Sequence, residues 1–478
     1  MTYQKMIVAL DIGTSGCRAA AVCADGTLAA HHYVPLTPVR KAAGLSEYEA
    51  SALLQASLQA LQAVLDKVGP EQVASLAVAS QRSTVVLFDK TSGQAVAPVL
   101  TWEDGRAQQQ AAQAPISQEE VHALTGLYKT PFFSAPKIAW SLQAVPQAAQ
   151  TLHAGNLLAA PVASYLIWHF TKGAVFATDY TLAQRTLLFD ITTLSWSETL
   201  CQAFGIPGEI LPQVFPTCAD YGSYTYRGVC IPITVCSGDQ QAAAAYFNLQ
   251  PHESLINYGT GAFWLYHAGE KPVFLPGMLT SLAAGGDKAS YLLEGPVNCA
   301  ASALLWLKAQ GISFEDEKVD ELCRLSTEPV LFLPALGGLG APYWDYHVSA
   351  AVDNLSPRTR KADWVAGVLR AIALRLTDIA AYLRVHGYDT SGKIRVSGGL
   401  SRIAYLVSFQ ADLLQQDLYI TEQADATVLG AALLAARQAG ITPEFEQPQQ
   451  LVSPAVNEET AKQLYLRWQT FVARVRQK

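Results

Sequence analysis

Short apolar runs alternate along the chain with longer segments in which leucine and alanine recur at helical spacing. The first apolar run, at 6–12, ends in a turn of glycines and hydroxyls, and a second, at 19–23, leads into Asp25-Gly26, a strong hairpin signal. Leucines at helical spacing then occupy 49–68, and a further apolar run occupies 73–79. This alternation predicts an α/β fold.

The same patterns predict the remaining elements. A proline-bounded loop at 131–140 begins a helix, and a polar loop is expected at 178–181. The other predicted helices are 159–170, 195–204, 300–308, 362–386, 403–414 and 426–440. The other predicted strands are 85–88, 231–235, 255–258, 262–266, 290–293, 393–396 and 418–421.

A turn near the start of the chain is repeated in its second half. Gly13-Thr14-Ser15-Gly16 follows the first strand, and Gly259-Thr260-Gly261 likewise joins two apolar runs. Two similar domains, each aiming a glycine and hydroxyl turn at one interface, would grip a triphosphate from both sides. We therefore expect domains at 1–247 and 248–440, followed by a tail at 441–478 whose aromatic side chains dock it as a helix.

Composition narrows the class of protein. Of 478 residues, 50% are hydrophobic and 15% are charged, which is typical of a globular chain. The net charge of -7 and the lack of a Lys/Arg cluster argue against a nucleic acid partner. The opening apolar run is too short for a signal peptide, and no uninterrupted apolar segment reaches the ~18 residues of a membrane span. We therefore expect a soluble, cytoplasmic protein that has no membrane partner.

The eight cysteines carry no metal-binding pattern. None forms a C-x-x-C pair or another spacing typical of metal ligands. We interpret them as small core residues that stay unbonded to one another in a reducing cell interior.

A polar stretch in the middle of the chain, at 236–241, joins a β-branched strand to a run of small residues. In open α/β folds such a junction lies at the carboxyl edge of the sheet, where ligands bind. Asp239 is placed there as a general base that accepts the proton of an attacking hydroxyl, and Gln240 as a hydrogen-bond partner of that hydroxyl. The residues alone leave an alternative open, in which Asp239 caps the following helix.

The opening turn has the chemistry of a phosphate site. Its glycines let main-chain N–H groups approach an anion, and the hydroxyls of Thr14 and Ser15 add donors. Asp11, near the end of the preceding strand, can hold a hydrated magnesium ion. Hairpins of this composition also occur in proteins that bind no nucleotide.

Two further strand ends present polar side chains. Arg82 follows the strand at 73–79, and Asp104 follows the apolar run that ends at Leu100. With Trp102 as an apolar face, these residues would form the wall of a pocket for a polyhydroxy ligand. In the alternative interpretation, Arg82 and Asp104 form a surface ion pair and Trp102 belongs to the core.

These motifs belong to a longer ordered series. Its members are 11–15 (Asp-Ile-Gly-Thr-Ser), Ser80-Gln81-Arg82, Trp102-Glu103-Asp104, 133–137, Thr178-Asp179-Tyr180, Gly238-Asp239-Gln240-Gln241, Tyr258-Gly259-Thr260-Gly261, 339–345 and Ser397-Gly398-Gly399. In residues, order and extent, over roughly 6–440, the series resembles the FGGY family of carbohydrate kinases, and within it most closely the glycerol kinases.

The resemblance implies two actin-like (ribonuclease H-like) domains with ATP and Mg2+ in the cleft between them. It implies that Asp239 is the catalytic base and that Arg82 and Gln240 contact the acceptor. The nucleotide contacts that it implies are Thr14, Ser15, Gly16, Arg18, Gly259, Thr260, Gly261 and Gly399.

Several positions depart from the glycerol kinase pattern. Ser83 stands where those enzymes have a glutamate, and Phe132 where they have a pocket tyrosine. Near the nucleotide, Ala301 and Leu305 replace a glycine and a glutamine, and Ile403 replaces an asparagine. The departures therefore bear on the acceptor and on the adenine contact.

We therefore predict an ATP-dependent kinase of a small sugar or polyol, with a ketose or a four- to five-carbon polyol favoured over glycerol. Ser83 and Phe132 lack the charge and the hydroxyl that would hold a short triol. The short serine also leaves room for a longer acceptor whose hydroxyls reach Ser83, Asp104 and Gln240.

Two alternatives stay open. In the first, water or a loop residue replaces the missing glutamate and the chain is a glycerol kinase. In the second, the chain is a non-catalytic sugar sensor with the kinase fold, against which the retained Asp11, Thr14, Asp239 and Thr260 argue. The sequence also leaves the oligomeric state open, with a homodimer as one candidate.

Overall fold

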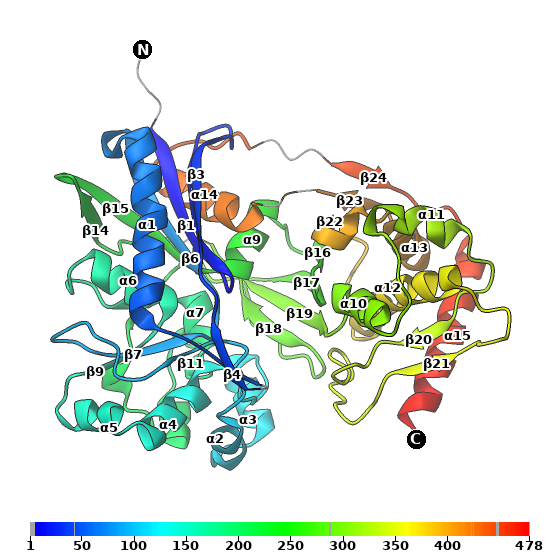
Figure 1. The fold of residues 1–478 in the computed structure, drawn as a ribbon, viewed down its shortest axis with the longest axis horizontal. Coiled ribbons are helices and arrows are strands. Elements are labelled where there is room, and N and C mark those ends of the chain that lie inside the picture. The colour runs from blue at the N-terminus through cyan, green and yellow to red at the C-terminus, as the bar shows by residue number, and fades with distance from the viewer. Residues whose placement is uncertain are drawn as a thin grey trace.

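The computed structural model describes residues 5–42, 44–285, 288–421, 423, 425–445 and 449–477. Two mixed sheets form the cores of two halves of the molecule, and the chain passes from the first half to the second in the middle of its length (Figure 1). Smaller sheets and helices surround them.

The elements are bounded as follows. The strands of the first large sheet are β1 (Met6–Ile12), β2 (Gly16–Val22), β3 (Leu28–Pro35), β6 (Val73–Ser80), β14 (Ser223–Tyr226) and β15 (Val229–Gly238). Those of the second are β16 (Ser254–Tyr258), β17 (Ala262–Gly269), β18 (Leu279–Leu282), β19 (Tyr291–Val297), β22 (Ile394–Ser397), β23 (Leu418–Ile420) and β24 (Gln450–Val452). The smaller sheets contain β4 (Val39–Ala42), β5 (Leu45–Tyr48), β7 (Val85–Asp89), β8 (Val99–Leu100), β9 (Leu157–Pro161), β10 (Ala177–Asp179), β11 (Phe189–Asp190), β12 (Ser195–Trp196), β13 (Gln213–Phe215), β20 (Leu331–Leu333) and β21 (Ala351–Asp353).

The helices of the first half are α1 (Ala50–Val68), α2 (Gln108–Gln113), α3 (Gln118–Thr125), α4 (Ser134–Ala144), α5 (Pro146–His153), α6 (Val162–Phe170), α7 (Tyr180–Gln184), α8 (Glu198–Phe204) and α9 (Asp239–Phe247). The later helices are α10 (Ala301–Ala309), α11 (Val319–Arg324), α12 (Lys361–Val385), α13 (Ala404–Leu414), α14 (Ala426–Gln438) and α15 (Glu458–Arg476). Short 3-10 helices are η1 (Pro70–Gln72), η2 (Gly208–Ile210), η3 (Asp316–Lys318) and η4 (Gly399–Arg402).

The first large sheet, in the order β14-β15-β6-β1-β2-β3, brings three strand ends to one edge. β1 pairs antiparallel with β2 and parallel with β6, so that Ile12 lies beside Ser80. β15 runs parallel to β6 on its other side, with Gly238 opposite Ser80. The residues that follow β6 and β15 therefore meet the end of β1 at one edge of the sheet.

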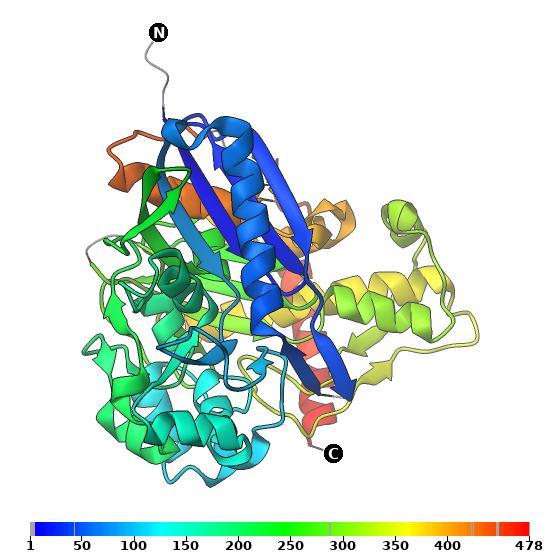
Figure 2. The same cartoon turned by 60° about the vertical axis from the view of Figure 1, so that its left-hand side comes forward.

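Side chains of β1 alternate between the two faces of this sheet, as successive residues of a strand must. Val8 and Leu10 lie in a core with α1 and α6, whereas Ile7 and Ala9 pack in a second core with α9 and α14. Figure 2 shows α1 lying across the blue strands of the sheet.

Helix α14 comes from late in the chain, yet it packs on the first sheet and on α9. The two helices approach closely, because a Cβ atom on Gly430 would lie 1.8 Å from the main-chain oxygen of Ala242. Only glycine fits this contact. The domain limits 1–247, 248–440 and 441–478 stay predictions, because α14 falls in the second range and packs against the first.

The second large sheet, in the order β18-β19-β17-β16-β22-β23-β24, repeats the central arrangement of the first. β16 pairs antiparallel with β17 and parallel with β22, as β1 does with β2 and β6. Helices α12 and α13 pack with its core. The prediction of an α/β fold with two actin-like (ribonuclease H-like) halves is confirmed.

The halves are also joined along β18. The Gln184 side chain on α7 accepts a hydrogen bond from the Leu282 N–H at 2.8 Å and donates to the Thr280 oxygen at 2.5 Å. The His122 ring lies 3.1 Å from the Met278 oxygen. These contacts tie the edge of the second sheet to the helices of the first half.

Three predicted elements differ in the structure. Residues 159–161, predicted to begin a helix, belong to β9, because β7 offers them a strand partner, and the helix begins at Val162. The predicted polar loop at 178–181 is buried, and Asp179 accepts the N–H groups of Thr181 and Leu182 and so caps α7. The helix predicted from 195 begins only after Ser197, whose hydroxyl caps it.

None of the eight cysteines forms a disulfide. Six are buried as expected, Cys23 is partly buried, and Cys230 is exposed. The expectation that all are core residues is therefore wrong for Cys230, which lies on β15 near its exposed hairpin end. In the part of the chain that the structure describes, no helix is long and apolar enough to cross a membrane.

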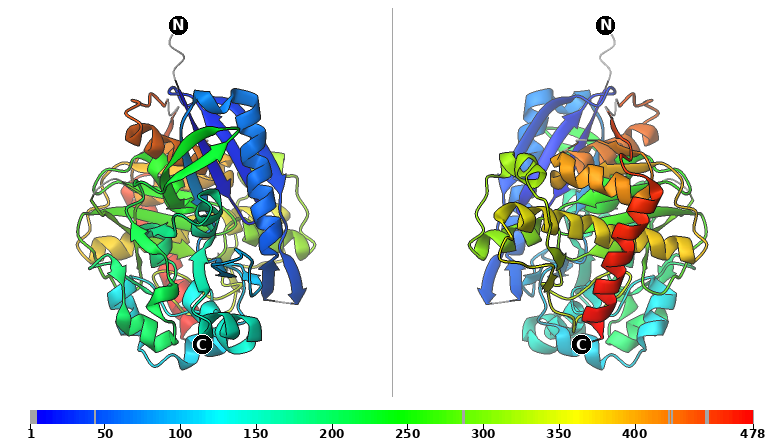
Figure 3. Two further views of the ribbon diagram at one scale, coloured as in Figure 1. Left: turned by 90° about the vertical axis from the view of Figure 1, so that its left-hand side faces the viewer. Right: turned by 90° about the vertical axis from the view of Figure 1, so that its right-hand side faces the viewer.

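The tail docks as the sequence predicts, through α15 (Figure 3, right, in red). Trp468, Phe471 and Val472 are buried in the core of the second half. The Trp468 indole and the Tyr465 hydroxyl both donate to Asp378 of α12, each at 3.0 Å. Residues 446–448 and 478 of the predicted tail lie outside the described residues.

Trp468→Ala should lower the free energy of unfolding by about 3–5 kcal/mol, because it leaves a cavity and removes a donor from a buried carboxylate. Leu466→Ala is the matched control on the same helix, since Leu466 is 56% exposed. Urea denaturation should show little change for this control. Similar losses in both variants would mean that the tail is not docked through Trp468.

Candidate active site

Asp239 lies at the junction between β15 and α9, at the edge of the first large sheet where β1 and β6 also end. It is the first residue of the helix, and Gly238 is the N-cap. The Asp239 carboxylate accepts the N–H of Gln240 at 2.7 Å. The alternative in which Asp239 is the helix cap is therefore wrong.

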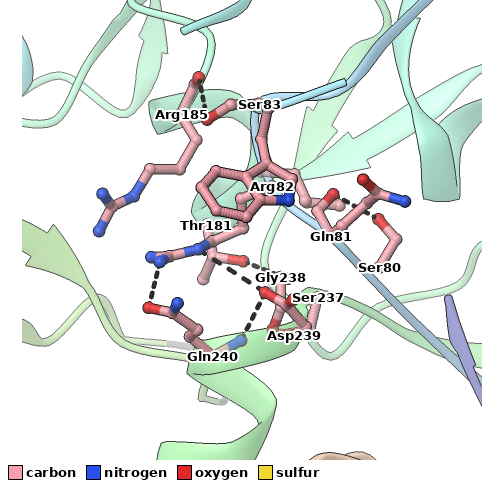
Figure 4. Close-up of polar contacts among 12 residues, drawn as sticks. Ser80, Gln81, Arg82, Ser83, Thr181, Arg185, Ser237, Gly238, Asp239 and Gln240 are labelled. Atoms are coloured by element: carbon pink, nitrogen blue, oxygen red, sulfur yellow. Dashed lines mark hydrogen bonds and ion pairs between the residues drawn. The ribbon is translucent and has the colours of Figure 1, made fainter. Parts of the chain in front are cut away.

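Arg82, at the end of β6, faces this carboxylate (Figure 4). Its Nε atom lies 3.7 Å from Asp239 Oδ1, and its Nη2 group donates to the Gln240 side-chain oxygen. Burial raises the pKa of Asp239, and the charge of Arg82 only partly opposes this shift. Burial likewise lowers the pKa of Arg82 to about 10. The structure thus brings Arg82, Asp239 and Gln240 together.

A buried acid from the second half reaches the same guanidinium. Glu294 on β19 lies 3.9 Å from Arg82 Nη1 and accepts from Arg185 Nη2 at 2.6 Å and Ser281 Oγ at 2.8 Å. Burial alone would raise the pKa of Glu294, but Arg185 and Arg82 together hold it below its ordinary value. Neither Glu294 nor Arg185 was predicted as a site residue. The signal of a buried charge in the sequence is that Glu294 directly follows the apolar run 291–293.

Three further predicted acceptor residues come from three segments: Ser83 lies between β6 and β7, Trp102 after β8 and Phe132 before α4. Ser83 has a left-handed backbone, with φ of 64°, and its hydroxyl donates to the Arg185 carbonyl oxygen at 3.3 Å. Trp102 is 44% exposed and its indole donates to Thr14 Oγ1 at 2.8 Å. Phe132 is 50% exposed. The alternative that Trp102 belongs to the core is therefore wrong.

Asp104 has a different place from the one predicted. It is fully buried, and its oxygens accept the Ser46 N–H at 2.7 Å and the Arg106 guanidinium at 2.7 and 2.8 Å. The prediction that Asp104 contacts an acceptor is therefore wrong, because these groups already occupy both of its oxygens. The alternative of an Arg82–Asp104 surface pair is also wrong, because each of the two has other partners.

Two tyrosines donate hydrogen bonds to main-chain oxygens of the opening turn. The Tyr48 hydroxyl donates to the Thr14 oxygen at 2.5 Å, and the Tyr33 hydroxyl donates to the Ser15 oxygen at 2.6 Å. A Cβ atom on Gly16 would lie 2.4 Å from the end of the exposed Tyr33 side chain, which would have to shift to admit a larger residue. The turn is therefore fixed by its carbonyl groups.

Asp11 is a buried carboxylate with an oxygen that lacks a partner. Its Oδ1 atom has no hydrogen bond within the described part of the chain. Burial, with further contributions from Asp239 and Asp425, raises its pKa to about 7, against the opposing charge of Arg18. Arg18 itself forms an ion pair with Asp425. Asp11 therefore has the donor chemistry that a hydrated divalent cation needs. Among the described residues, no cluster of three or more acidic, histidine or cysteine side chains could hold a metal.

A cavity of about 510 Å³ lies between the halves, next to this cluster. Gln240 and Ala243 of α9 form its wall on the first half, and Gly259 and Gly399 contribute from the second. Thr260 and Gly261 belong to the same turn as Gly259. In the first half, Thr14 and Ser15 lie in the turn after β1, and Gly16 and Arg18 lie on β2, but none of these four residues lines the cavity. Gly399 lies after β22.

Two actin-like halves with a glycine-lined cavity between them define a phosphotransferase of the kinase class. Residues 6–245 match the N-terminal domain of the FGGY family of carbohydrate kinases, and residues 254–439 match its C-terminal domain. The chain belongs to this family, and it is an ATP-dependent kinase of a small sugar or polyol.

Similar proteins cover the whole chain. A glycerol kinase of Halorhodospira halophila is 33% identical over 98% of this chain and 96% of its own length. An apulose kinase of Pectobacterium atrosepticum is 32% identical over 99% of both chains. The crystal structure of Plasmodium falciparum glycerol kinase with ADP superposes with a TM-score of 0.90 at 25% identity, over 99% of this chain and 98% of that one.

Glu294→Gln should lower the free energy of unfolding at neutral pH by about 3–5 kcal/mol, because it leaves Arg185 buried beside a neutral amide. The folded pKa of Glu294 lies below its ordinary value of 4.5, so its stabilisation is present above that value and is lost as the pH falls through the folded pKa. The difference between wild type and variant in urea denaturation should therefore shrink on acidification.

Glu270→Gln is the control, because Glu270 forms an exposed pair with Lys288. This variant should change stability little at either pH. An equal loss in the two variants, or a difference for Glu294→Gln that is independent of pH, would contradict the assignment of a buried interdomain ion pair.

Proposed function

We propose that this kinase phosphorylates a hydroxyl of a ketose or of a four- to five-carbon polyol in preference to glycerol. The observation that carries the proposal is the identity of two residues in the proposed wall of the acceptor pocket, Ser83 and Phe132. At these positions the resemblance to glycerol kinases leads one to expect a glutamate and a tyrosine. The Ser83 hydroxyl is directed to a main-chain oxygen, and half of the Phe132 side chain is open to solvent.

Polar pockets discriminate through hydrogen bonds, because a buried hydroxyl without a partner costs about 1–3 kcal/mol. Glycerol would lose a carboxylate and a phenol partner at these positions. A longer acceptor fills the space beside the small Ser83 side chain and brings extra hydroxyls to Ser83, Arg82 and Gln240. Asp104 is not among these partners, since it is buried against Arg106.

Asp239 is the proposed general base. Its partly buried carboxylate has a raised pKa, which makes it a stronger proton acceptor than a fully exposed aspartate. Arg82 and Gln240 bond each other at its side, and acceptor hydroxyls would take over these donor and acceptor groups. Asp239 then removes the proton as the hydroxyl attacks the γ-phosphorus in line.

Mg2+ is proposed to be held through Asp11, whose unpartnered Oδ1 fits it, and when bound it offsets charge on the phosphate oxygens. The proposed nucleotide contacts come from both halves, so that the phosphates are gripped from two sides. They are Thr14, Ser15, Gly16, Arg18, Gly259, Thr260, Gly261 and Gly399. Cysteines that form no disulfide are typical of a reducing compartment, so we propose that the kinase works in the cytoplasm, and a homodimer stays a prediction.

Glycerol kinase is the second candidate function. The relative from Halorhodospira halophila, which matches along nearly the whole chain, carries that name and favours it. The relative named apulose kinase is almost as similar and supports a sugar acceptor. Sequence similarity alone therefore does not separate the two, and Ser83 and Phe132 are the residues that favour the longer acceptor.

Asp239→Asn should lower kcat by about 10² or more, the usual effect of losing a general base, with ATP binding and thermal stability close to wild type. Asp25→Asn is the control, since Asp25 is an exposed aspartate that accepts the Thr27 N–H. Steady-state kinetics with the best acceptor and calorimetric titration of ATP measure both effects. Near-native turnover of Asp239→Asn would refute its role as base.

Wild type should show a kcat/KM for erythritol, ribulose or xylulose at least about tenfold above that for glycerol. The double variant Ser83→Glu/Phe132→Tyr should gain activity on glycerol, because it restores the carboxylate and the phenol hydroxyl. A coupled assay of ADP release across these acceptors makes the comparison. A wild type that prefers glycerol to all of them would overturn the proposed acceptor.

A further inference from the structure

A lysine next to the residues of the proposed acceptor pocket is completely buried. Lys137, on α4, has no exposed surface, and its ammonium group ends among three main-chain oxygens. It donates to Thr101 and Phe132 at 2.6 Å each and to Ser83 at 3.2 Å. An ammonium group has three N–H donors and no acceptor, so these three oxygens match its full bonding capacity.

The three oxygens belong to three different segments of the chain, and each segment carries or adjoins a proposed acceptor residue. Ser83 follows Arg82 after β6. Thr101 directly precedes Trp102 after β8, and Phe132 lies in the loop before α4. The first two segments are also joined to each other, by the pairing of Val85 with Leu100 and by the bond from the Trp102 N–H to Thr84 Oγ1 at 3.0 Å. Lys137 adds the contact that ties the Phe132 loop to both of them.

We propose that Lys137 is the positioning residue of the acceptor pocket, in which one ammonium group holds the three wall segments at a common point. The proposal rests on the pocket proposed above, but not on which acceptor fills it. Hydrogen bonds from a charged donor are roughly twice as strong as neutral ones, which suits a group that must fix three loops.

The backbone of Ser83 supports this role. Its φ of 64° is a left-handed conformation that costs a non-glycine residue free energy and persists only where the surroundings hold it. Lys137 binds the carbonyl oxygen of this residue, and the Ser83 side chain bonds Arg185. The same contact therefore fixes the residue whose identity we propose to decide the acceptor.

The charge of Lys137 also responds to pH. Burial lowers its pKa to about 7, while the nearby Asp104 raises it and Arg106 lowers it further. A neutral amine has only two N–H donors, so one of the three oxygens loses its bond once the proton leaves. The wall should therefore loosen as the pH rises through about 7.

Lys137→Met keeps the length of the side chain and removes its donors. We expect KM for the acceptor to rise about tenfold or more, because small displacements of binding groups cost one to two orders of magnitude, with KM for ATP within about twofold of wild type. Lys129→Met is the matched control, since Lys129 also donates to two main-chain oxygens, of Ala114 and Ile116, away from the pocket. It should leave both KM values unchanged, whatever it does to thermal stability.

The pH dependence separates positioning from general stability. KM for the acceptor in wild type should rise severalfold from about pH 6 to about pH 8.5, and Lys137→Met should lack this rise. Asp11 and Asp239 are present in both proteins, so the difference between the two profiles isolates Lys137. If Lys137→Met does not fold, Lys137→Gln, which has no titratable group and fewer donors, replaces it in both comparisons.

Each variant is assayed with the acceptor that wild type uses best, so a preference for glycerol would contradict the proposed acceptor and leave this test intact. The proposal is overturned if Lys137→Met changes KM for the acceptor no more than Lys129→Met does. It is equally overturned if Lys137→Met raises KM for ATP as much as KM for the acceptor.

Discussion

Charges held away from water need partners, and four charged side chains, two buried and two partly buried, meet between the two halves of this kinase. Arg82 lies between Asp239 of its own half and Glu294 of the other, and Glu294 in turn binds Arg185. Removing any one partner leaves another charge buried and uncompensated. The strand ends of the first sheet, the edge of the second and the proposed catalytic base therefore depend on one set of contacts.

This arrangement also bears on how the halves move. Along β18, Gln184 binds Thr280 and Leu282 across the junction, and at α14 the late part of the chain packs on the first sheet. The cavity of about 510 Å³ lies away from the β18 contacts, between α9 and the glycine turns. These contacts restrict any closing of the two halves around ligands to motions that keep β18 and α14 in contact with the first half.

Hydrophobic periodicity predicted the long helices and the two hairpins correctly, because those patterns are local. The strand-to-helix junction before Asp239 was also readable, since it depends on neighbouring residues. Contacts between distant residues were not: Asp104 binds Ser46, 58 positions away, and Glu294 binds Arg185, 109 positions away. The sequence does not distinguish a strand-end side chain that faces a pocket from one that binds a distant residue. Asp104 was therefore predicted to line the pocket, and Glu294 was not predicted as a site residue.

The place of α14 bears on how the protein is made. Polypeptides emerge from the ribosome amino terminus first, and early domains usually fold as they appear. Here the face of the first sheet that carries Ile7 and Ala9 has no complete cover until residues 426–438 have been synthesised. Until almost the entire chain has been made, part of that apolar face is therefore exposed to water or bound by a chaperone. Gly430, which lets the late helix settle against α9, thus acts at the last step of the first half's assembly.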